Sequence, residues 1–139
     1  MAKLSQELVG KAQQAKKRAY VPYSQFPVGA ALLASNGRIY TGCNVEISSY
    51  GLTICAERTA IFKAISEGER NFKAIAIVSN DPEIISPCGA CRQVLWDLAG
   101  NIDVIMSTPK GKTKTQKLKT LIPYAFDSKN LERTLKRKR

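Results

Sequence analysis

The sequence predicts a single α/β domain, and the order of its segments and its composition both support this. Helical and strand-like segments follow one another in the order helix, hairpin, helix, strand, helix, strand. Because strands that alternate with helices are typical of parallel pairing, the last connections are expected to be right-handed crossovers between parallel strands. The 139 residues, 44% hydrophobic and 24% charged, fit one globular domain rather than two and exclude a disordered chain.

The first third of the chain predicts a helix followed by a hairpin. Apolar side chains recur at helical spacing through residues 4–19, and Pro22 ends this helix because proline disfavours the helical conformation of the residue before it. Residues 26–34 are apolar and predict a buried strand. The Ser-Asn-Gly sequence at 35–37 is typical of a tight turn, and residues 38–43 then form the returning strand.

The middle of the chain predicts two core helices and two further strands. Residues 55–68 have an apolar stripe at helical spacing and end on Gly68, a residue typical of helix C-termini. The short apolar run at 72–79 suits a strand buried on both faces, and residues 102–107 suit another. Between them, a second core helix opens at Pro87.

The positive charge of the chain is concentrated at its C-terminal end. The net charge is +11, but residues 1–109 hold 11 Lys and Arg against 9 Asp and Glu, whereas residues 110–139 hold 11 against 2. A solvated, lysine-rich surface and a tail are favoured over a polyanion-binding site, so nucleic acid is an unlikely partner. We therefore expect a folded domain over 1–128 and a basic C-terminal helix or tail over 129–139.

Neither membrane insertion nor secretion is indicated. No stretch approaches the roughly 18 consecutive apolar residues of a membrane span. The first residues, Met-Ala-Lys-Leu-Ser-Gln-Glu, lack the apolar core of a secretory signal. The sequence therefore predicts a cytoplasmic protein with no membrane partner.

Four cysteines and the absence of histidine restrict the chemistry. The cysteines could form two disulfides, but in a cytoplasmic chain with enough apolar residues for a core, metal binding or catalysis is the better expectation. Without histidine, a Ser-His or Cys-His hydrolase is excluded, and any transition-metal site must use thiolates and carboxylates. Cys43, in the returning strand, is expected to be a small buried side chain.

Three of the cysteines have the spacing of a metal site. Cys88 and Cys91 flank two residues at a helix entry, a pattern shared by tetrahedral metal sites and by thioredoxin-type redox pairs. Cys55 opens the other core helix, with Glu57 two residues further on. If the two helix starts converge, three thiolates would bind zinc and leave its fourth position to water, as in catalytic zinc sites.

A charge argument adds Arg58 to this candidate site. Zinc with three thiolates has a formal charge of −1, which makes it a poor Lewis acid. Two helix N-termini and an arginine that donates to the sulfurs would withdraw part of that charge. Arg58 is the neighbouring arginine, although an ordinary surface arginine in the first helical turn is the alternative interpretation.

These motifs together resemble the small cytidine deaminases whose zinc ligands are all cysteine. The resemblance is carried by Thr-Ile-Cys-Ala-Glu-Arg-Thr-Ala at 53–60 and Ser-Pro-Cys-Gly-Ala-Cys-Arg-Gln at 86–93, and it extends to 20–32 and 42–50. It covers about residues 5–126. It implies a three-layer cytidine deaminase-like fold with a five-stranded mixed sheet flanked by helices. It also implies one zinc per chain and a homotetramer with active sites at subunit interfaces.

The resemblance also implies the reaction and the roles of residues. Cytidine or deoxycytidine would be hydrolysed at C4 to the uridine product and ammonia, with Glu57 moving the protons between water, ring N3 and the leaving amine. Asn44 and Glu46 alternate with one intervening residue, so they share a face that suits the sugar hydroxyls. The implied substrate-binding residues are Phe26, Asn44, Glu46, Tyr50, Ala56 and Phe126. Which subunit supplies Tyr50 and Phe126 is left open by the sequence.

Three functions stay open at this stage. The first is a free-nucleoside deaminase, the second a deaminase of a base within nucleic acid or of a nucleoside antibiotic such as blasticidin, and the third a non-catalytic zinc module that binds polyanions. Glu57 argues against the third, because a structural site gains nothing from a carboxylate beside an open zinc position. The short chain and the pair Asn44 and Glu46 argue against a polynucleotide editor, which leaves the antibiotic deaminase as the closer rival.

Overall fold

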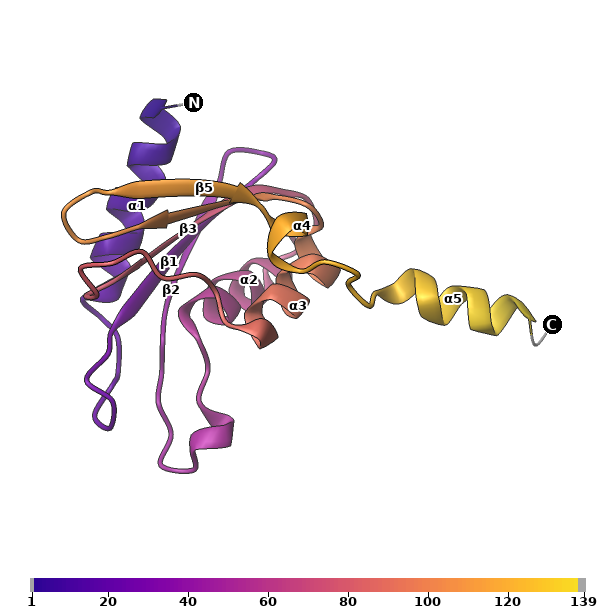
Figure 1. The fold of residues 1–139 in the computed structure, drawn as a ribbon, viewed down its shortest axis with the longest axis horizontal. Helices are drawn as coiled ribbons and strands as arrows, with labels where there is room; N and C mark the ends of the chain where they lie inside the picture. Colours follow the sequence, from indigo (N-terminus) through magenta and orange to yellow (C-terminus); the bar gives the residue numbers. More distant parts are fainter. Residues whose placement is uncertain (1, 138–139) are drawn as a thin grey trace.

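The computed structural model describes residues 2–137, which form a mixed five-stranded sheet with helices on both faces (Figure 1). In chain order the elements are α1 (Ala2–Lys16), β1 (Val28–Ala34), β2 (Ile39–Cys43), the 3-10 turn η1 (Tyr50–Leu52), α2 (Ala56–Ser66), β3 (Phe72–Ser79), α3 (Gly89–Ala99), β4 (Asp103–Ser107), β5 (Thr113–Lys117), α4 (Leu118–Leu121) and α5 (Ser128–Arg137). The strand order is β2-β1-β3-β4-β5. The predicted α/β class and the five-stranded mixed sheet are confirmed.

Side chains of the central strands point alternately to the two faces of the sheet, and this produces the three layers. In β1, Leu32 belongs to the core beneath α2 and α3, whereas its neighbours Ala31 and Leu33 pack in the core beneath α1. In β3, Ile75 and Ala76 divide between the two cores in the same way. Since successive side chains of a strand point to opposite faces, two apolar faces follow from an almost continuous apolar run.

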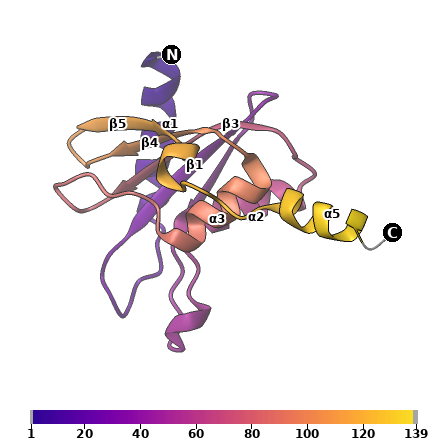
Figure 2. The same ribbon diagram turned by 45° about the vertical axis from the view of Figure 1, so that its right-hand side comes forward.

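Both helical crossovers connect parallel strands, as predicted. β1 pairs antiparallel with β2 and with β3, so β2 and β3 run in the same direction with β1 between them. Helix α2 connects these two strands, and α3 connects β3 to the adjacent parallel strand β4. Both crossover helices lie on one face of the sheet, which brings their starts to the same end of the molecule (Figures 1 and 2).

The first helix, predicted over 4–19, ends earlier than expected at Lys16, and the first strand, predicted over 26–34, begins later than expected at Val28. After Lys16 the chain makes i to i−3 hydrogen bonds, such as Arg18 N–H to the Ala15 carbonyl, so the helix tightens into turns before Pro22 is reached. Phe26 was expected inside the buried strand, but it lies in a loop and is 40% exposed. The left-handed backbone of Gln25, with φ of 55°, turns the chain just before it.

The lysine-rich segment contains a strand that residue patterns did not predict. Thr113–Lys117 forms β5, which pairs antiparallel with β4 at one edge of the sheet. Its side chains are mostly exposed, and Lys117 forms an ion pair of 3.0 Å with Asp103. Lysines on an edge strand hinder pairing with another sheet, which is a reason for their number here. Cys43, at the end of the opposite edge strand, is half-buried rather than buried as expected.

The C-terminal helix α5 extends away from the rest of the fold (Figures 1 and 2). Within residues 2–137, no hydrogen bond joins it to the sheet or to another helix. Its Leu131 and Leu135 are 56% and 63% exposed. Lys138 and Arg139, which complete the predicted tail, lie outside the described residues. None of the helices that the structure describes is long and apolar enough to cross a membrane.

Candidate active site

Two helices begin with a cysteine at the same place in the structure. Cys55 is the N-cap of α2 and Cys88 the N-cap of α3, each with extended backbone and neither making a side-chain capping bond. An N-cap position usually holds a side chain that accepts from the first turn, so these sulfurs are left free for another partner. The two helix N-termini place partial positive charge beside these sulfurs.

A glycine lets α2 approach the sheet closely enough to bring Cys55 there. A side chain at Gly42 in β2 would place its Cβ 2.5 Å from the Ala56 carbonyl oxygen and 2.5 Å from the Ala60 nitrogen. No real Cβ tolerates such contacts, so any other residue would push the first turn of α2 outward. The position of Cys55 and Glu57 therefore depends on this glycine.

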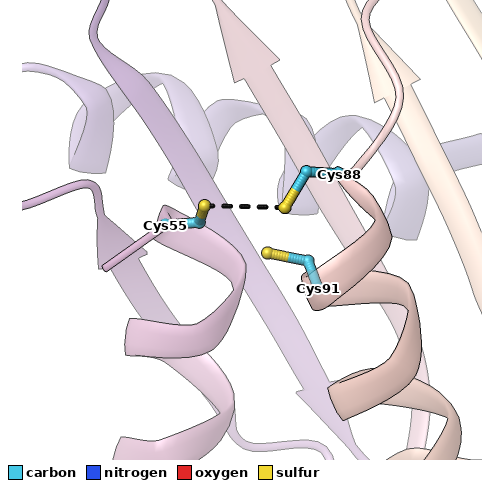
Figure 3. Close-up of side chains that lie close together, drawn as sticks. All are labelled: Cys55, Cys88 and Cys91. Atoms are coloured by element: carbon cyan, nitrogen blue, oxygen red, sulfur yellow. Dashed lines mark hydrogen bonds between the residues drawn. The ribbon is translucent and has the colours of Figure 1, made fainter. Parts of the chain in front are cut away.

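Three cysteine sulfurs form a compact cluster at the two helix starts. The Sγ atoms of Cys55, Cys88 and Cys91 all lie within 4.8 Å of one another and point toward a common centre (Figure 3). The Cys55 and Cys88 sulfurs are 3.8 Å apart, and the thiols are not joined by disulfides. Two thiolates bound tetrahedrally to zinc at about 2.3 Å would be about 3.8 Å apart, so this donor set fits zinc.

Arg58 lies against this cluster. Its Nη2 donates to the Cys55 sulfur at 3.3 Å, and its Nε is buried without a partner in the part of the chain that the structure describes. Hydrogen bonding to the Cys55 sulfur raises the pKa of the guanidinium, which keeps Arg58 charged. A fixed cation beside three thiolates offsets part of their negative charge.

The three sulfurs lie close enough for hydrogen bonds among them to change the pKa of Cys55 and that of Cys91. The pKa of Cys55 is lowered to about 5, first by a hydrogen bond from the Cys91 thiol and then by Arg58 and Cys88. The hydrogen bond to Cys55 and burial raise the pKa of Cys91. One thiolate is therefore already stabilised at neutral pH, which is the form that binds a metal.

Glu57 is buried beside the cysteines. It is 4% exposed, lies in the first turn of α2 and interacts with the Cys91 sulfur. Burial is the main cause that raises the pKa of this carboxyl to about 7. A carboxyl with a pKa near neutrality can both accept and donate a proton under ordinary conditions.

Asn44 and Glu46 both hold the loop that precedes β1. Asn44 Oδ1 accepts from the Val28 N–H at 2.9 Å, and its Nδ2 donates to the Phe26 carbonyl at 2.9 Å. Glu46 Oε1 accepts from the N–H groups of Tyr23 and Ser24 at 3.0 and 3.1 Å, and the Ser24 hydroxyl donates to Oε2. These hydrogen bonds, led by the Ser24 hydroxyl, lower the pKa of Glu46.

A hollow of about 390 Å³ lies beside Glu46. It is lined by Tyr23, Ser24, Glu46, Tyr50 and Thr53, and the rings of Tyr23 and Tyr50 meet edge to face with centroids 5.8 Å apart. Sequence reasoning missed Tyr23, Ser24 and Thr53. All three lie inside segments that carried the resemblance, Tyr23 and Ser24 in 20–32 and Thr53 in 53–60, which was the one signal available for them.

Of the expected substrate contacts, Glu46 and Tyr50 line this hollow, whereas Phe26, Asn44, Ala56 and Phe126 do not. Ala56 is fully buried at the first position of α2. Phe126 lies in the segment between α4 and α5 and is 56% exposed, and Tyr50 is 72% exposed in η1. The structure of one chain thus brings the cysteines and Glu57 together, but leaves all three of the expected aromatic contacts, Phe26, Tyr50 and Phe126, exposed to solvent.

Comparisons with known proteins agree with this geometry. The family described as "Cytidine and deoxycytidylate deaminase zinc-binding region" matches residues 2–107. A cytidine deaminase of Sporosarcina psychrophila is 49% identical over 127 residues, 91% of this chain and 93% of that protein. A cytidine deaminase of Mycobacterium tuberculosis is 44% identical over 126 residues, 91% of this chain and 92% of that protein.

Solved structures show the same fold. The crystal structure of a cytidine deaminase from Burkholderia pseudomallei superimposes with a TM-score of 0.85 and 44% sequence identity, covering 87% of this chain and 98% of that chain. The sequence match, the shared fold and the three-cysteine cluster lead to one conclusion. The chain belongs to the cytidine deaminase family, with a zinc-binding site of the three-cysteine type.

Proposed function

We propose that this protein catalyses the zinc-dependent hydrolysis of cytidine and deoxycytidine to uridine and deoxyuridine, releasing ammonia. The observation that carries the proposal is the convergence of three cysteine sulfurs and one buried glutamate at two helix starts. A purely structural zinc site is closed by a fourth protein ligand. Among the described residues, no further His, Cys, Asp or Glu joins the three cysteines in a metal-binding group.

Cys55, Cys88 and Cys91 would hold one zinc per chain. Bound there, zinc would act as a Lewis acid that lowers the pKa of water and makes hydroxide available at neutral pH. The contact of Arg58 with the Cys55 sulfur supports this role, because it reduces the charge that three thiolates donate to the metal.

Glu57 would move the protons of the reaction. Water adds to C4 of the cytosine ring, the bond from C4 to the exocyclic nitrogen breaks, and ammonia leaves. Glu57 would take one proton from the water and deliver it to ring N3. It would then take the remaining proton from the new C4 hydroxyl and give it to the leaving nitrogen as the bond from C4 to that nitrogen breaks. Its burial and its pKa of about 7 support this shuttle, since one group must both accept and release protons.

The hollow beside Glu46 is the candidate sugar subsite. Glu46 already accepts three hydrogen bonds, yet a carboxylate can accept about four, so a sugar hydroxyl can still donate to it. Asn44 keeps one unused Nδ2 hydrogen, since the other is given to the Phe26 carbonyl. Through that bond, Asn44 would also fix Phe26 beside the nucleoside. Ala56, fully buried, can offer only its backbone.

We further propose that the active form is a homotetramer with active sites at subunit interfaces. Aromatic side chains are unusually exposed on this chain: Tyr50, Tyr124, Phe62 and Phe126 are 72%, 105%, 44% and 56% exposed. Apolar surface of this kind is typical of a face that another protein covers. Tyr50 and Phe126 would then complete a nucleoside pocket across a boundary between copies.

One assay tests the proposed reaction against its alternatives. Ammonia release should be measured from cytidine, deoxycytidine, cytidine monophosphate and blasticidin, with zinc determined on the same sample. We expect turnover of the two free nucleosides and about one zinc per chain, as the three-thiolate site requires. Turnover of blasticidin alone would favour the antibiotic deaminase, and full activity without metal would contradict the mechanism.

A further inference from the structure

One guanidinium connects the zinc-binding loop with the C-terminal segment. Arg92, in the first turn of α3, donates from Nε to the Pro87 carbonyl at 2.7 Å and from Nη2 to the Ser86 hydroxyl at 2.8 Å. Ser86 and Pro87 directly precede Cys88. From Nη1, Arg92 also donates to the Leu121 carbonyl at 2.7 Å, at the last residue of α4.

The segment that follows Leu121 relies on α3 for its position. In residues 2–137, no backbone–backbone hydrogen bond involves residues 123–126. Its side-chain hydrogen bonds to the rest of the fold come from α3: Gln93 Nε2 donates to the Phe126 carbonyl at 2.7 Å, and Trp96 Nε1 donates to Asp127 Oδ2 at 3.3 Å. Toward α5, the Asp127 N–H donates to Asn130 Oδ1 at 3.0 Å. Tyr124, two residues before Phe126, adopts a left-handed backbone with φ of 56°, which is uncommon for a residue other than glycine.

We propose that Arg92 is a positioning residue that holds the loop before Cys88 and the segment before Phe126 in one fixed geometry. The proposal rests on the proposed function for its substrate-binding part only. Arg92 would keep the backbone that presents the Cys88 thiol in place and, together with Gln93, set where Phe126 stands. Zinc retention and nucleoside binding would thus share one side chain that touches neither ligand.

The chemistry of the side chain supports this role. Three oxygens from two separate segments accept from three different nitrogens of one planar group. Arginine fixes several donors in a rigid fork, whereas lysine offers one flexible ammonium that cannot occupy the three positions together. Arg92 is also partly buried, so water replaces these hydrogen bonds only incompletely when they are lost.

The test compares Arg92→Lys with a matched arginine elsewhere. Arg70 also donates to two backbone carbonyls, those of Ile65 and Glu69, but at the far end of α2. Zinc-loaded wild type, Arg92→Lys and Arg70→Lys should be mixed with a chromogenic chelator, and the KM for cytidine measured. We expect about tenfold faster zinc release and a raised KM in Arg92→Lys alone, as for other residues that support metal ligands.

Two further variants separate the two halves of the proposal. Ser86→Ala removes a contact of the zinc loop only, and Gln93→Met removes the donor to Phe126 only. Ser86→Ala should accelerate zinc release with little change in KM, and Gln93→Met should raise KM with zinc release unchanged. Both change side chains outside the buried core, so they report even if Arg92→Lys fails to fold.

The outcomes are decisive in each case. Wild-type zinc release in Arg92→Lys and Ser86→Ala would overturn the link to the zinc loop, and wild-type KM in Arg92→Lys and Gln93→Met would overturn the link to Phe126. If Arg70→Lys changes zinc release and KM as much as Arg92→Lys does, Arg92 stabilises the fold in general and has no specific positioning role. The chelator measurement needs no turnover, so it still decides the zinc half if the chain does not deaminate cytidine.

Discussion

The three-cysteine cluster and the aromatic side chains that we propose to contact substrate differ in how far they are buried in a single chain. Cys91 and Glu57 are buried, and the cluster is held by the starts of two core helices. Tyr50 and Phe126 are mostly exposed and lie in a 3-10 turn and an irregular segment. One chain therefore buries Cys91 and Glu57, whereas the proposed substrate-binding aromatics would be covered only in the proposed assembly.

The substitution Glu57→Gln is the sharpest probe of the half of the site that consists of the three cysteines and Glu57. The amide has nearly the same shape but cannot shuttle protons, so kcat should fall by about 10²–10⁴. Zinc should stay at about one per chain, because Glu57 is not a ligand in the proposed site. Glu67→Gln, at the exposed C-terminal end of the same helix, is the control and should leave kcat unchanged. Near-normal turnover of Glu57→Gln would refute the proton-transfer role.

A smaller effect is expected from Arg58→Gln. The neutral amide no longer offsets the charge of the thiolates, so zinc affinity or kcat should fall by roughly 10–100-fold. The measurement is zinc retention against a competing chelator, followed by kcat of the fully loaded enzyme. If zinc retention and kcat both match the wild type, Arg58 is an ordinary arginine in the first helical turn. The negative charge of the three thiolates would then not need this arginine to offset it.

For the exposed half, Phe126→Ala should raise KM for cytidine by about tenfold, since base–aromatic stacking is worth about 1–3 kcal/mol. Leu131→Ala, on the exposed face of α5, is the control. If Phe126 acts on a neighbouring copy, co-refolded mixtures of Phe126→Ala and Glu57→Gln chains should recover wild-type sites. If the mixed chains assemble but activity is not recovered, Phe126 acts on the site of its own chain or lies outside the pocket.

The predictable parts of the molecule are those set by local sequence. Ser35 to Gly37 indicated a tight turn, and Gly37 indeed has a φ of 91° there. The apolar run 72–79 matches β3 at both ends, because every residue of this strand except Lys73 is buried. Cys55 and Cys88 were expected at helix starts, and each lies one residue before its helix. The local pattern of residues was enough to predict both positions.

The features that the sequence did not predict depend on contacts between distant segments. Thr-Lys-Thr-Gln-Lys at 113–117 has no apolar alternation and becomes a strand because β4 offers an edge to pair with. Tyr23 and Ser24 reach the candidate sugar subsite because Glu46, more than twenty residues later, accepts from their N–H groups. No pattern within one segment encodes such a pairing, which explains why the binding surface was less predictable than the metal cluster.

The smallest effect is expected at the C-terminus, where we propose that residues 129–139 lie outside the deaminase domain of residues 1–128. Removing residues 133–139 deletes five basic residues but keeps Asn130, whose side chain accepts from the Asp127 N–H at 3.0 Å. Cytidine is uncharged, so the positive field of this segment does not steer it, and kcat/KM should stay within about twofold at any salt concentration. A chain ending at residue 122 is the contrast, because it also loses Phe126 and the segment that Gln93 and Trp96 hold. If removing only residues 133–139 already abolishes activity, α5 belongs to the surface that completes the binding site, despite its separation from the sheet in one chain.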